Sequence, residues 1–405
     1  MKKTLALILS IVFVIGMLAG CGDKATTSSN GDTTQNGVPA DFKVGFIFLH
    51  DENSTYDKNF MDAANAAAET CGLTKDQVLF KTGIAETDAC YNAAAELVDE
   101  GCDVIFADSF GHESFLLQAA EEFTDVQFCH ATGTQAKVKN LPNYHNAFAS
   151  IYEGRFLAGV AAGMKLNEMI EKGEITKDQA KIGYVGAFDY AEVVSGMTSF
   201  YLGAKYICES VTMEVTFTNS WFDIALEKEA ANSLIADKCV LISQHADSEG
   251  APKACEAAGV PNVAYNISTI SMAPNTALIS SKINWQPYME LIIKNTINGE
   301  VIPVDYCPGI KEGSVVLTEL NEKVAAKGTK EAIEDAKAKI ISGDLKVFDT
   351  SRFTVKGKTL TEQLADIDGD YTPDTNVITD GYYHESELRS APYFDIKYID
   401  GITQK

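Results

Sequence analysis

Short apolar runs alternate with alanine-rich helical patterns along most of this chain, and this alternation limits the possible folds more than any other feature. Amphipathic stretches such as DAANAAAETCG and ALEKEAANSLIAD separate runs of the length and character of buried strands. The runs lie at 43–50, 77–80, 103–108, 126–130, 143–150, 181–188, 213–218, 239–244, 262–266 and 276–280. The alternation predicts βαβ units, and therefore an α/β fold whose parallel sheets are covered by helices on both faces.

The same plan occurs twice in the sequence. The stretches DACYNAAAELVDEGCDVIFAD (88–108) and ALEKEAANSLIADKCVLISQHAD (225–247) each contain an alanine-rich helix, a short break and a buried strand. A chain of 405 residues is also long for a single core. We therefore expect two α/β lobes of the kind found in hinged binding proteins. One large doubly wound domain is the alternative.

The beginning of the chain has the pattern of a bacterial export signal. Two lysines precede an apolar run (4–17) that is too short to span a membrane as a mature helix, and the letters LAGC follow, ending at Cys21. This resembles a lipobox, so we expect residues 1–20 to be removed and Cys21 to carry the lipid. Residues 21–40 are rich in small polar residues, which predicts a disordered tether. A plain secretory signal and an N-terminal anchor helix are the alternatives.

Charge and cysteine usage narrow the possible partners and sites. The chain has 33 basic and 57 acidic residues, for a formal charge of −24, which repels phosphate backbones. We therefore expect no nucleic-acid partner.

Eight cysteines follow Cys21, none in a CxxC pair, and several lie in apolar runs such as VQFCH. We expect buried thiols here, with disulfide bonds as the alternative.

Polar and aromatic residues collect where the expected strands end. Ligands bind outside the carboxyl ends of the strands in open parallel sheets, so these positions are candidate ligand contacts. They are His50, Asp51, Asp108, His130, Asp189, Trp221, Asp223, His245, Asp247 and Asn266. Any one of them could instead be a loop or capping residue, and Asp223 and Asp247 are candidate helix N-caps.

These residues do not predict a metal site or an enzyme. The histidines lie at different strand ends, and the sequence has no HxxxH or HExxH pair. The stretch DIDGDYTPD (366–374) begins like a calcium loop but lacks its glycine at the sixth position and its glutamate at the twelfth. We expect no metal, no cofactor and no catalytic residue. An anchored hydrolase that uses His130 or His245, with Ser109 as a weak candidate nucleophile, is the alternative.

Three aromatic residues near these strand ends indicate a planar ligand. Phe60 lies near the start of the first expected helix, Trp221 follows a strand, and Trp285 follows the TALISS run. Rings on both faces of a flat ligand, with polar groups at its edges, are a common binding arrangement. Phe60 and Trp285 could equally belong to the cores of the lobes.

Several longer stretches occur in a familiar order: VGFIFLHDENSTYDKNFMDA, IYEGRFLAGVAAG, IGYVGAFDYAEVVSGMTSFYLGA, TNSWFDIALEKEAANSLI and ISQHADSEGAPKACEAAG. With the lipobox they resemble the basic membrane protein family of ABC-transporter substrate-binding lipoproteins, which includes purine nucleoside receptors. The resemblance extends to about residue 318. It implies a type I periplasmic-binding-protein fold, with two Rossmann-like lobes, parallel sheets and a three-crossover hinge. Lobe 1 would comprise 41–148 and 268–318, and lobe 2 would comprise 149–267 and 319–405.

The resemblance also implies which residues contact the ligand. It gives Phe60 and Trp221 the role of stacking on a purine. His130 and Asn266 stand where nucleoside receptors have ribose-binding aspartates, which favours the ring over the sugar, and Glu192 would bond a base edge. The complete expected contact set is His50, Asp51, Phe60, His130, Glu192, Trp221, His245, Asp247, Asn266 and Trp285.

Together these expectations describe a receptor. We expect a monomer, anchored through lipid to the extracytoplasmic face of the cell membrane, that binds a purine base or nucleoside and delivers it to the permease of an ABC importer. The alternative within the same fold is another small polar ligand, such as an amino acid or a sugar. Arg155 is expected to brace the hinge, so it does not supply the cation that an amino acid carboxylate requires.

The lipobox gives a first testable prediction. We expect Cys21→Ala to abolish both fatty-acid labelling and retention in the membrane fraction, because the cysteine thiol is the acyl acceptor. Cys71→Ala is the matched control and should behave as the wild type. A Cys21→Ala protein that still incorporates labelled fatty acid would contradict the assignment.

Overall fold

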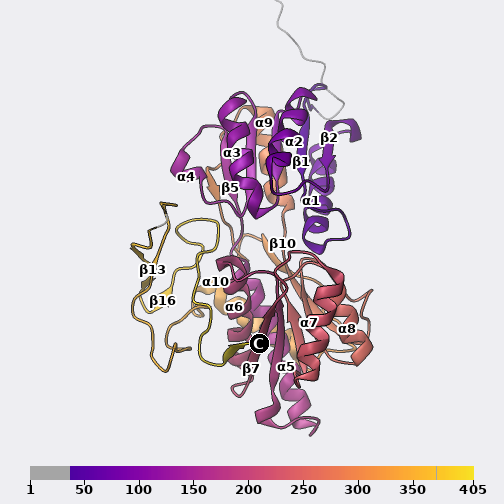
Figure 1. The fold of residues 1–405 in the computed structure, drawn as a ribbon, viewed down its shortest axis with the longest axis vertical. Coiled ribbons are helices and arrows are strands. Elements are labelled where there is room, and N and C mark those ends of the chain that lie inside the picture. The colour runs from indigo at the N-terminus through magenta and orange to yellow at the C-terminus, as the bar shows by residue number, and fades with distance from the viewer. Residues whose placement is uncertain (1–36, 371) are drawn as a thin grey trace, which may run out of the picture.

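The computed structural model of the chain describes residues 37–370 and 372–405, and its two α/β lobes lie one above the other (Figure 1). Cys21, the expected signal peptide and residues 22–36 of the expected tether lie outside this range, so their assignments stay predictions. The expected end of the tether at residue 40 is corrected, because Val38 is already buried in the hydrophobic core. None of the described helices is both long enough and apolar enough to cross a membrane.

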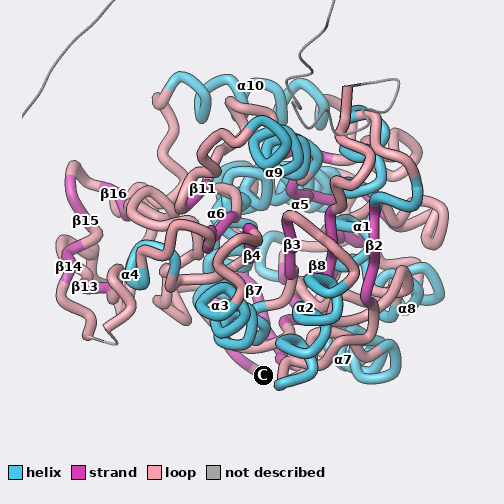
Figure 2. Tube along the Cα trace, turned by 90° about the horizontal axis from the view of Figure 1, so that it is seen from above, coloured by secondary structure: helices cyan, strands magenta, loops and turns pink. Residues whose placement is uncertain are grey.

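The first lobe is built on a six-stranded parallel sheet of order β11-β5-β4-β3-β1-β2. The strands are β1 (Val44–Ile47), β2 (Val78–Lys81), β3 (Val104–Ala107), β4 (Gln127–Ala131), β5 (Tyr144–Ala147) and β11 (Asp305–Tyr306). The helices are α1 (Thr55–Cys71), α2 (Asp88–Asp99), α3 (Glu113–Glu122), α4 (Ala136–Lys139) and α9 (Gln286–Asn298). Helices α2 and α3 bury one face of the sheet, and α1 and α9 bury the other (Figure 2).

The second lobe has a seven-stranded sheet of order β12-β10-β9-β8-β6-β7-β17, parallel except for the β10–β12 pair. The strands are β6 (Lys181–Gly186), β7 (Thr212–Phe217), β8 (Leu241–Gln244), β9 (Asn262–Tyr265), β10 (Ala277–Ile283), β12 (Val315–Leu317) and β17 (Ile402–Gln404). The helices are α5 (Ile151–Glu171), α6 (Ala191–Ile207), α7 (Ile224–Ala236), α8 (Gly250–Ala258) and α10 (Thr329–Ser342).

The C-terminal part of the chain leaves this regular pattern. After α10 it forms two small hairpins, which lie to one side of the lobes in both views (Figures 1 and 2), before β17 joins the second sheet. The hairpin strands are β13 (Leu364–Ala365), β14 (Thr375–Asn376), β15 (Ile378–Thr379) and β16 (Tyr382–Tyr383).

The expected two-lobed α/β fold is confirmed, and each of the ten predicted strands is present. The chain crosses between the sheets three times, between β5 and α5, between β10 and α9, and between β11 and β12. One boundary is corrected. We expected 268–318 in lobe 1, but β10 and β12 pair within the second sheet, and only α9 and β11 of this stretch belong to the first lobe. An apolar run predicts a strand without showing which sheet it joins.

Local signals explain where several helices begin and end. Ser54 caps α1 by accepting a hydrogen bond from the Asp57 main chain, and Gly72 ends the same helix at a left-handed φ of 78°. Asp223 caps α7 as expected, since its Oδ1 accepts from Ala225 N and Leu226 N at 2.9 Å. Asp247 does not cap α8, whose N-cap is Glu249; its side chain lies in the interlobe site described below.

The cysteines behave as small apolar residues. The eight that follow Cys21 are free thiols, and six of them are buried. Burial raises the pKa of Cys90 and of Cys255 to about 12, which keeps both thiols protonated. The expectation of buried thiols is confirmed for these six, while Cys71 and Cys307 are half-buried.

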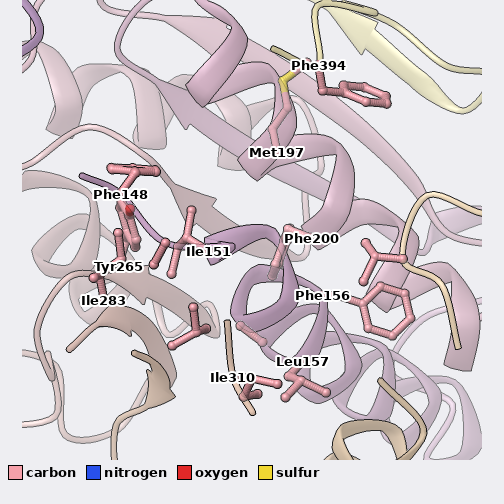
Figure 3. Close-up of a cluster of buried hydrophobic side chains, with 14 of the residues drawn as sticks. Phe148, Ile151, Phe156, Leu157, Met197, Phe200, Tyr265, Ile283, Ile310 and Phe394 are labelled. Atoms are coloured by element: carbon pink, nitrogen blue, oxygen red, sulfur yellow. The ribbon is translucent and has the colours of Figure 1, made fainter. Parts of the chain in front are cut away.

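Helices α5 and α6 cross at unusually short range in the core of the second lobe. Phe156 and Leu157 of α5 and Met197 and Phe200 of α6 belong to one buried cluster (Figure 3). The crossing brings main chain against main chain, because a Cβ atom on Gly203 would lie 1.9 Å from the Phe156 carbonyl oxygen.

The close approach of α5 and α6 predicts that one added methyl group at Gly203 lowers the stability of the protein. We expect Gly203→Ala to lower the free energy of unfolding by about 1–3 kcal/mol, because the helices must move apart to admit the Cβ. The measurement is the midpoint of urea unfolding, with Glu171→Ala at the exposed end of α5 as the control. An unchanged midpoint for Gly203→Ala would show that the helices do not approach this closely.

Candidate ligand-binding cavity

A cavity of ≈ 370 Å³ lies between the two lobes, at the carboxyl ends of their strands. Its wall combines residues from both lobes with three residues from the end of the chain. The lining residues are Leu49, His50, Tyr56, Asp57, Ser109, Phe110, Thr132, Thr134, Tyr190, Ala191, Glu192, Trp221, His245, Asp247, Arg389, Ala391 and Pro392.

Aromatic rings from both lobes surround this cavity. Phe110 of lobe 1 meets Tyr190 of lobe 2, with ring centres 5.5 Å apart, and their exposed fractions of 47% and 43% place them at the mouth. Trp221 packs edge-on against Phe188 at 4.9 Å. On the other side, the Tyr56 hydroxyl donates to the Asp108 carbonyl oxygen at 2.9 Å, which fixes the Tyr56 ring at the start of α1. These rings offer flat apolar surface to a ligand from both lobes.

A chain of three polar side chains reaches the cavity from the interior of lobe 2. Arg155, with an exposed fraction of only 1%, donates to His245 Nδ1 at 2.9 Å and to the Gln244 carbonyl oxygen at 3.0 Å. A guanidinium can only donate, so Nδ1 must accept, and the ring proton must lie on Nε2. That nitrogen then donates to Glu192 Oε2, 2.8 Å away. The pKa of His245 is lowered, chiefly by burial, which agrees with a neutral ring.

This chain leaves one acceptor without a protein donor. Glu192 Oε1 is buried and has no hydrogen-bond partner among the described residues. Since Oε2 is held by His245, the carboxylate cannot turn away without losing that bond. Glu192 therefore brings to the cavity wall a carboxylate that is fixed through Oε2 and whose Oε1 is not used by any described residue.

On the lobe 1 side, Asp57 is held in its charged form. Burial raises its pKa, but hydrogen bonds from His50 and Ser54 outweigh burial, and the net pKa is lowered. The donors are the His50 main chain at 2.8 Å, the His50 ring at 3.3 Å and the Ser54 hydroxyl at 2.5 Å. All of these distances are within hydrogen-bonding range, so His50 is oriented by Asp57 at the cavity wall.

Asp247 differs from Asp57 in charge and connects the lobes. Burial first, and then the Glu227 charge, raise its pKa well above the ordinary value, which favours the neutral acid. Asn266 Nδ2 donates a hydrogen bond to Asp247 Oδ1 at 3.0 Å. The main-chain oxygen of Asp247 accepts a hydrogen bond from Thr55 N at 2.8 Å, and this bond joins lobe 2 directly to the first turn of α1. The lobes are therefore closed on each other at this point.

The structure brings together half of the expected contact set. The five that line the cavity are His50, Glu192, Trp221, His245 and Asp247, and Asn266 supports Asp247 from behind. Asp51 is exposed in the loop after β1 and does not line the cavity. The remaining three, Phe60, His130 and Trp285, are corrected by the structure.

Phe60 and Trp285 are core residues of lobe 1. Their rings stack at 4.4 Å, and their exposed fractions are 0% and 2%. Phe60 lies one helical turn deeper in the lobe than Tyr56, so Tyr56 takes the cavity position that we expected of Phe60. An aromatic residue in the first helical turn after a strand is the sequence signal that identifies this position.

His130 lies beneath the cavity wall. Its Nε2 is 2.7 Å from the Ser109 carbonyl oxygen, and burial lowers its pKa to about 4. The Ser109 hydroxyl donates to Glu86 Oε1 at 2.6 Å. Because His130 reaches the carbonyl and not the hydroxyl of Ser109, these two residues do not form the nucleophile–base pair that a hydrolase needs.

Sequence reasoning missed seven lining residues that matter here, one of which is Asp57 in the first turn of α1. Tyr56, Phe110 and Tyr190 follow strands by a few residues, beyond the strand-end positions that predicted ligand contacts. Arg389, Ala391 and Pro392 lie in an irregular segment far along the chain, where no periodicity predicts a position. Among the described residues, one acidic group has metal-like spacing, Asp366 with Asp368 and Asp370, and none of the three lines the cavity.

Comparison with known proteins agrees with this arrangement. The family model described as an ABC transporter substrate-binding protein, PnrA-like, matches residues 47–351. A purine-binding protein of Brucella abortus is 30% identical over 338 residues, covering 84% of this chain and 88% of that protein. A putative ABC transporter glucose-binding protein of Haloferax volcanii is 32% identical over 251 residues, covering 62% and 60%.

A solved structure shares the fold. The ABC transporter solute-binding protein of Aeropyrum pernix superposes with a TM-score of 0.63 at 19% identity, over 76% of this chain and 93% of that one. The resemblance seen in the sequence is therefore confirmed, and the chain belongs to the PnrA-like family of ABC transporter substrate-binding proteins.

Proposed function

We propose that this chain is an extracytoplasmic receptor that holds a purine base or nucleoside in the interlobe cavity and delivers it to an ABC importer. The observation that carries the proposal is the combination of aromatic rings from both lobes with the fixed acceptor Glu192 in one cavity. The purine-binding relative supports the same ligand class.

The chemistry of the wall suits a purine. The flat faces of the base would lie against rings such as Trp221 and Tyr56, and base–aromatic stacking stabilises such contacts. The N–H groups at the edge of the base would donate to Glu192 Oε1, which has no protein donor. Asp247 in its neutral form would add a donor without adding charge.

The choice between base and nucleoside stays open. His130 and Asn266 take the places of ribose-binding acids, but neither of them lines the cavity, so they give no reason to disfavour a sugar. Asp57 and Asp247 do line it, and carboxyl groups of this kind can bond ribose hydroxyls. The proposal therefore covers both ligands.

Attachment to the membrane through Cys21 is part of the proposal. Its support is the LAGC run and the polar stretch behind it, and all but the last four residues of that stretch lie before the first described residue. A lipid on Cys21 would hold the lobes near a permease while the tether lets them turn.

A sugar is the second candidate ligand. The glucose-binding name of the Haloferax relative favours it, and sugars are also bound by ring stacking and carboxylates. Isothermal titration of the purified full chain with adenine, hypoxanthine, adenosine and glucose separates the candidates. Purine binding with no heat from glucose supports the proposal, and the reverse result overturns it.

Trp221 gives the first site prediction. We expect Trp221→Ala to weaken purine binding by about 1–3 kcal/mol, because it removes one stacking surface. The melting temperature without ligand should change little, since the ring is only half-buried. Trp285→Leu is the matched control, because Trp285 is a core residue; it should lower the melting temperature and leave the affinity of the folded protein nearly unchanged. A Trp221→Ala protein that melts early and binds normally would make Trp221 a core residue instead.

Glu192 gives the second prediction about the binding site. We expect Glu192→Gln to weaken binding by about 1–1.5 kcal/mol, because a hydrogen bond to a charged acceptor becomes one to a neutral amide of about half its strength. Glu209→Gln, at an exposed position just after α6, is the control for the change in net charge. Equal affinities for Glu192→Gln and the wild type would show that Glu192 does not contact the ligand.

A further inference from the structure

Part of the cavity wall comes from outside the region that defines the family. The family model ends at residue 351, and we call residues 352–405 the C-terminal segment. This segment supplies Arg389, Ala391 and Pro392 to the wall of the interlobe cavity. The binding site is therefore built from the two lobes and from a third element.

The segment is fastened to lobe 1 on both sides of Arg389. The Lys137 ammonium, on α4, donates to the Leu388 carbonyl oxygen at 2.8 Å. The Ser390 main chain donates to both carboxylate oxygens of Asp305, on β11, at 3.0 and 3.2 Å. Lys137 and Asp305 also form an ion pair at 2.9 Å. These bonds fix the main chain of residues 388–390 against the first lobe.

The same segment is fastened to lobe 2 a few residues away. The Ser195 hydroxyl, on α6, donates to the buried Glu385 carboxylate at 2.6 Å. Lys397 forms an ion pair with Asp189, and Phe394 belongs to the buried cluster that contains Met197 of α6 (Figure 3). The segment ends as β17, beside β7 in the second sheet. Arg389 is thus held between the lobes by contacts to both.

Arg389 has donors to spare at this position. Its Nε donates to the Ala391 carbonyl oxygen at 3.2 Å, and its Nη1 donates to the Asp366 carbonyl oxygen at 3.0 Å. A guanidinium has five N–H groups, so three are left over. The two bonds go to main-chain carbonyls, while the carboxylates of Asp366, Glu113 and Asp305 act on the guanidinium through their charge. Among the described residues that line the cavity, Arg389 is the one lysine or arginine.

We infer that Arg389 contacts the ligand and selects a 6-oxopurine over a 6-aminopurine. The inference rests on the proposed purine ligand and adds its chemical class. The two parallel N–H groups at the end of a guanidinium match two adjacent acceptors, as at O6 and N7 of an oxopurine. An aminopurine presents a donor in place of O6, which would face the guanidinium N–H. The N1–H of the oxopurine is a donor of the kind that Glu192 requires.

The test compares hypoxanthine with adenine, two bases of nearly equal size that differ at position 6. Isothermal titration of the purified full chain should show at least about tenfold tighter binding of hypoxanthine. Arg389→Gln should lose about tenfold in hypoxanthine affinity and keep its adenine affinity within about threefold, so that the preference disappears. Arg389→Lys keeps the charge without the planar fork and should also lose most of the preference.

A matched control and a fold check accompany these variants. Arg352→Gln changes the same charge at an exposed position that does not line the cavity, and it should keep the wild-type preference. Melting curves should show that each variant is folded. An unchanged ratio of the two affinities in Arg389→Gln, or an adenine preference in the wild type, overturns the role of Arg389 and leaves the purine receptor standing. A wild-type chain that binds neither base and neither of the matching nucleosides, inosine and adenosine, overturns both.

Discussion

The buried guanidinium of Arg155 determines how the interlobe cavity is built. A charged group removed from water costs several kcal/mol unless its donors are used. Arg155 uses its two Nη atoms on the Gln244 carbonyl and on His245, and its guanidinium lies 3.4 Å from the centre of the Tyr265 ring. These contacts fix the end of β8 and choose the tautomer of His245. Through that tautomer they orient Glu192, so the arginine that we expected at the hinge acts on the cavity wall through His245.

The cavity also depends on the closed arrangement of the lobes. The main-chain bond from Thr55 to Asp247 joins the first turn of α1 to the loop after β8. His50 lies 5.4 Å from Phe222 across the same boundary. Residues on both sides of these contacts line the cavity, so opening the lobes would separate the rings and polar groups that form it. A ligand that touches both walls would favour closure, because it binds the closed form better than the open one.

The architecture was readable from the sequence, because buried parallel strands are continuous apolar runs and helices between them keep an amphipathic period. The pairing of β10 could not be predicted, because an apolar run does not show which strands it will pair with. About half of the expected ligand contacts could be predicted from the sequence. Strand-end residues such as His245 follow from topology, whereas the choice between Tyr56 and Phe60 depends on depth along one helix. The position of Arg389 at the cavity could not be predicted from the sequence, since this residue lies in an irregular segment whose position depends on contacts to both lobes.

The two tryptophans allow a direct test of ligand position. Trp221 lies at the cavity and Trp285 is buried in lobe 1, so Trp285→Phe leaves Trp221 as the single tryptophan of the chain. The measurement is the fluorescence of this variant during titration with hypoxanthine and, separately, with glucose. A purine that stacks in the cavity should change the emission saturably, with one binding site per chain, while glucose leaves it unchanged. Saturable purine binding by calorimetry with no change in Trp221 emission would place the ligand elsewhere and contradict this account.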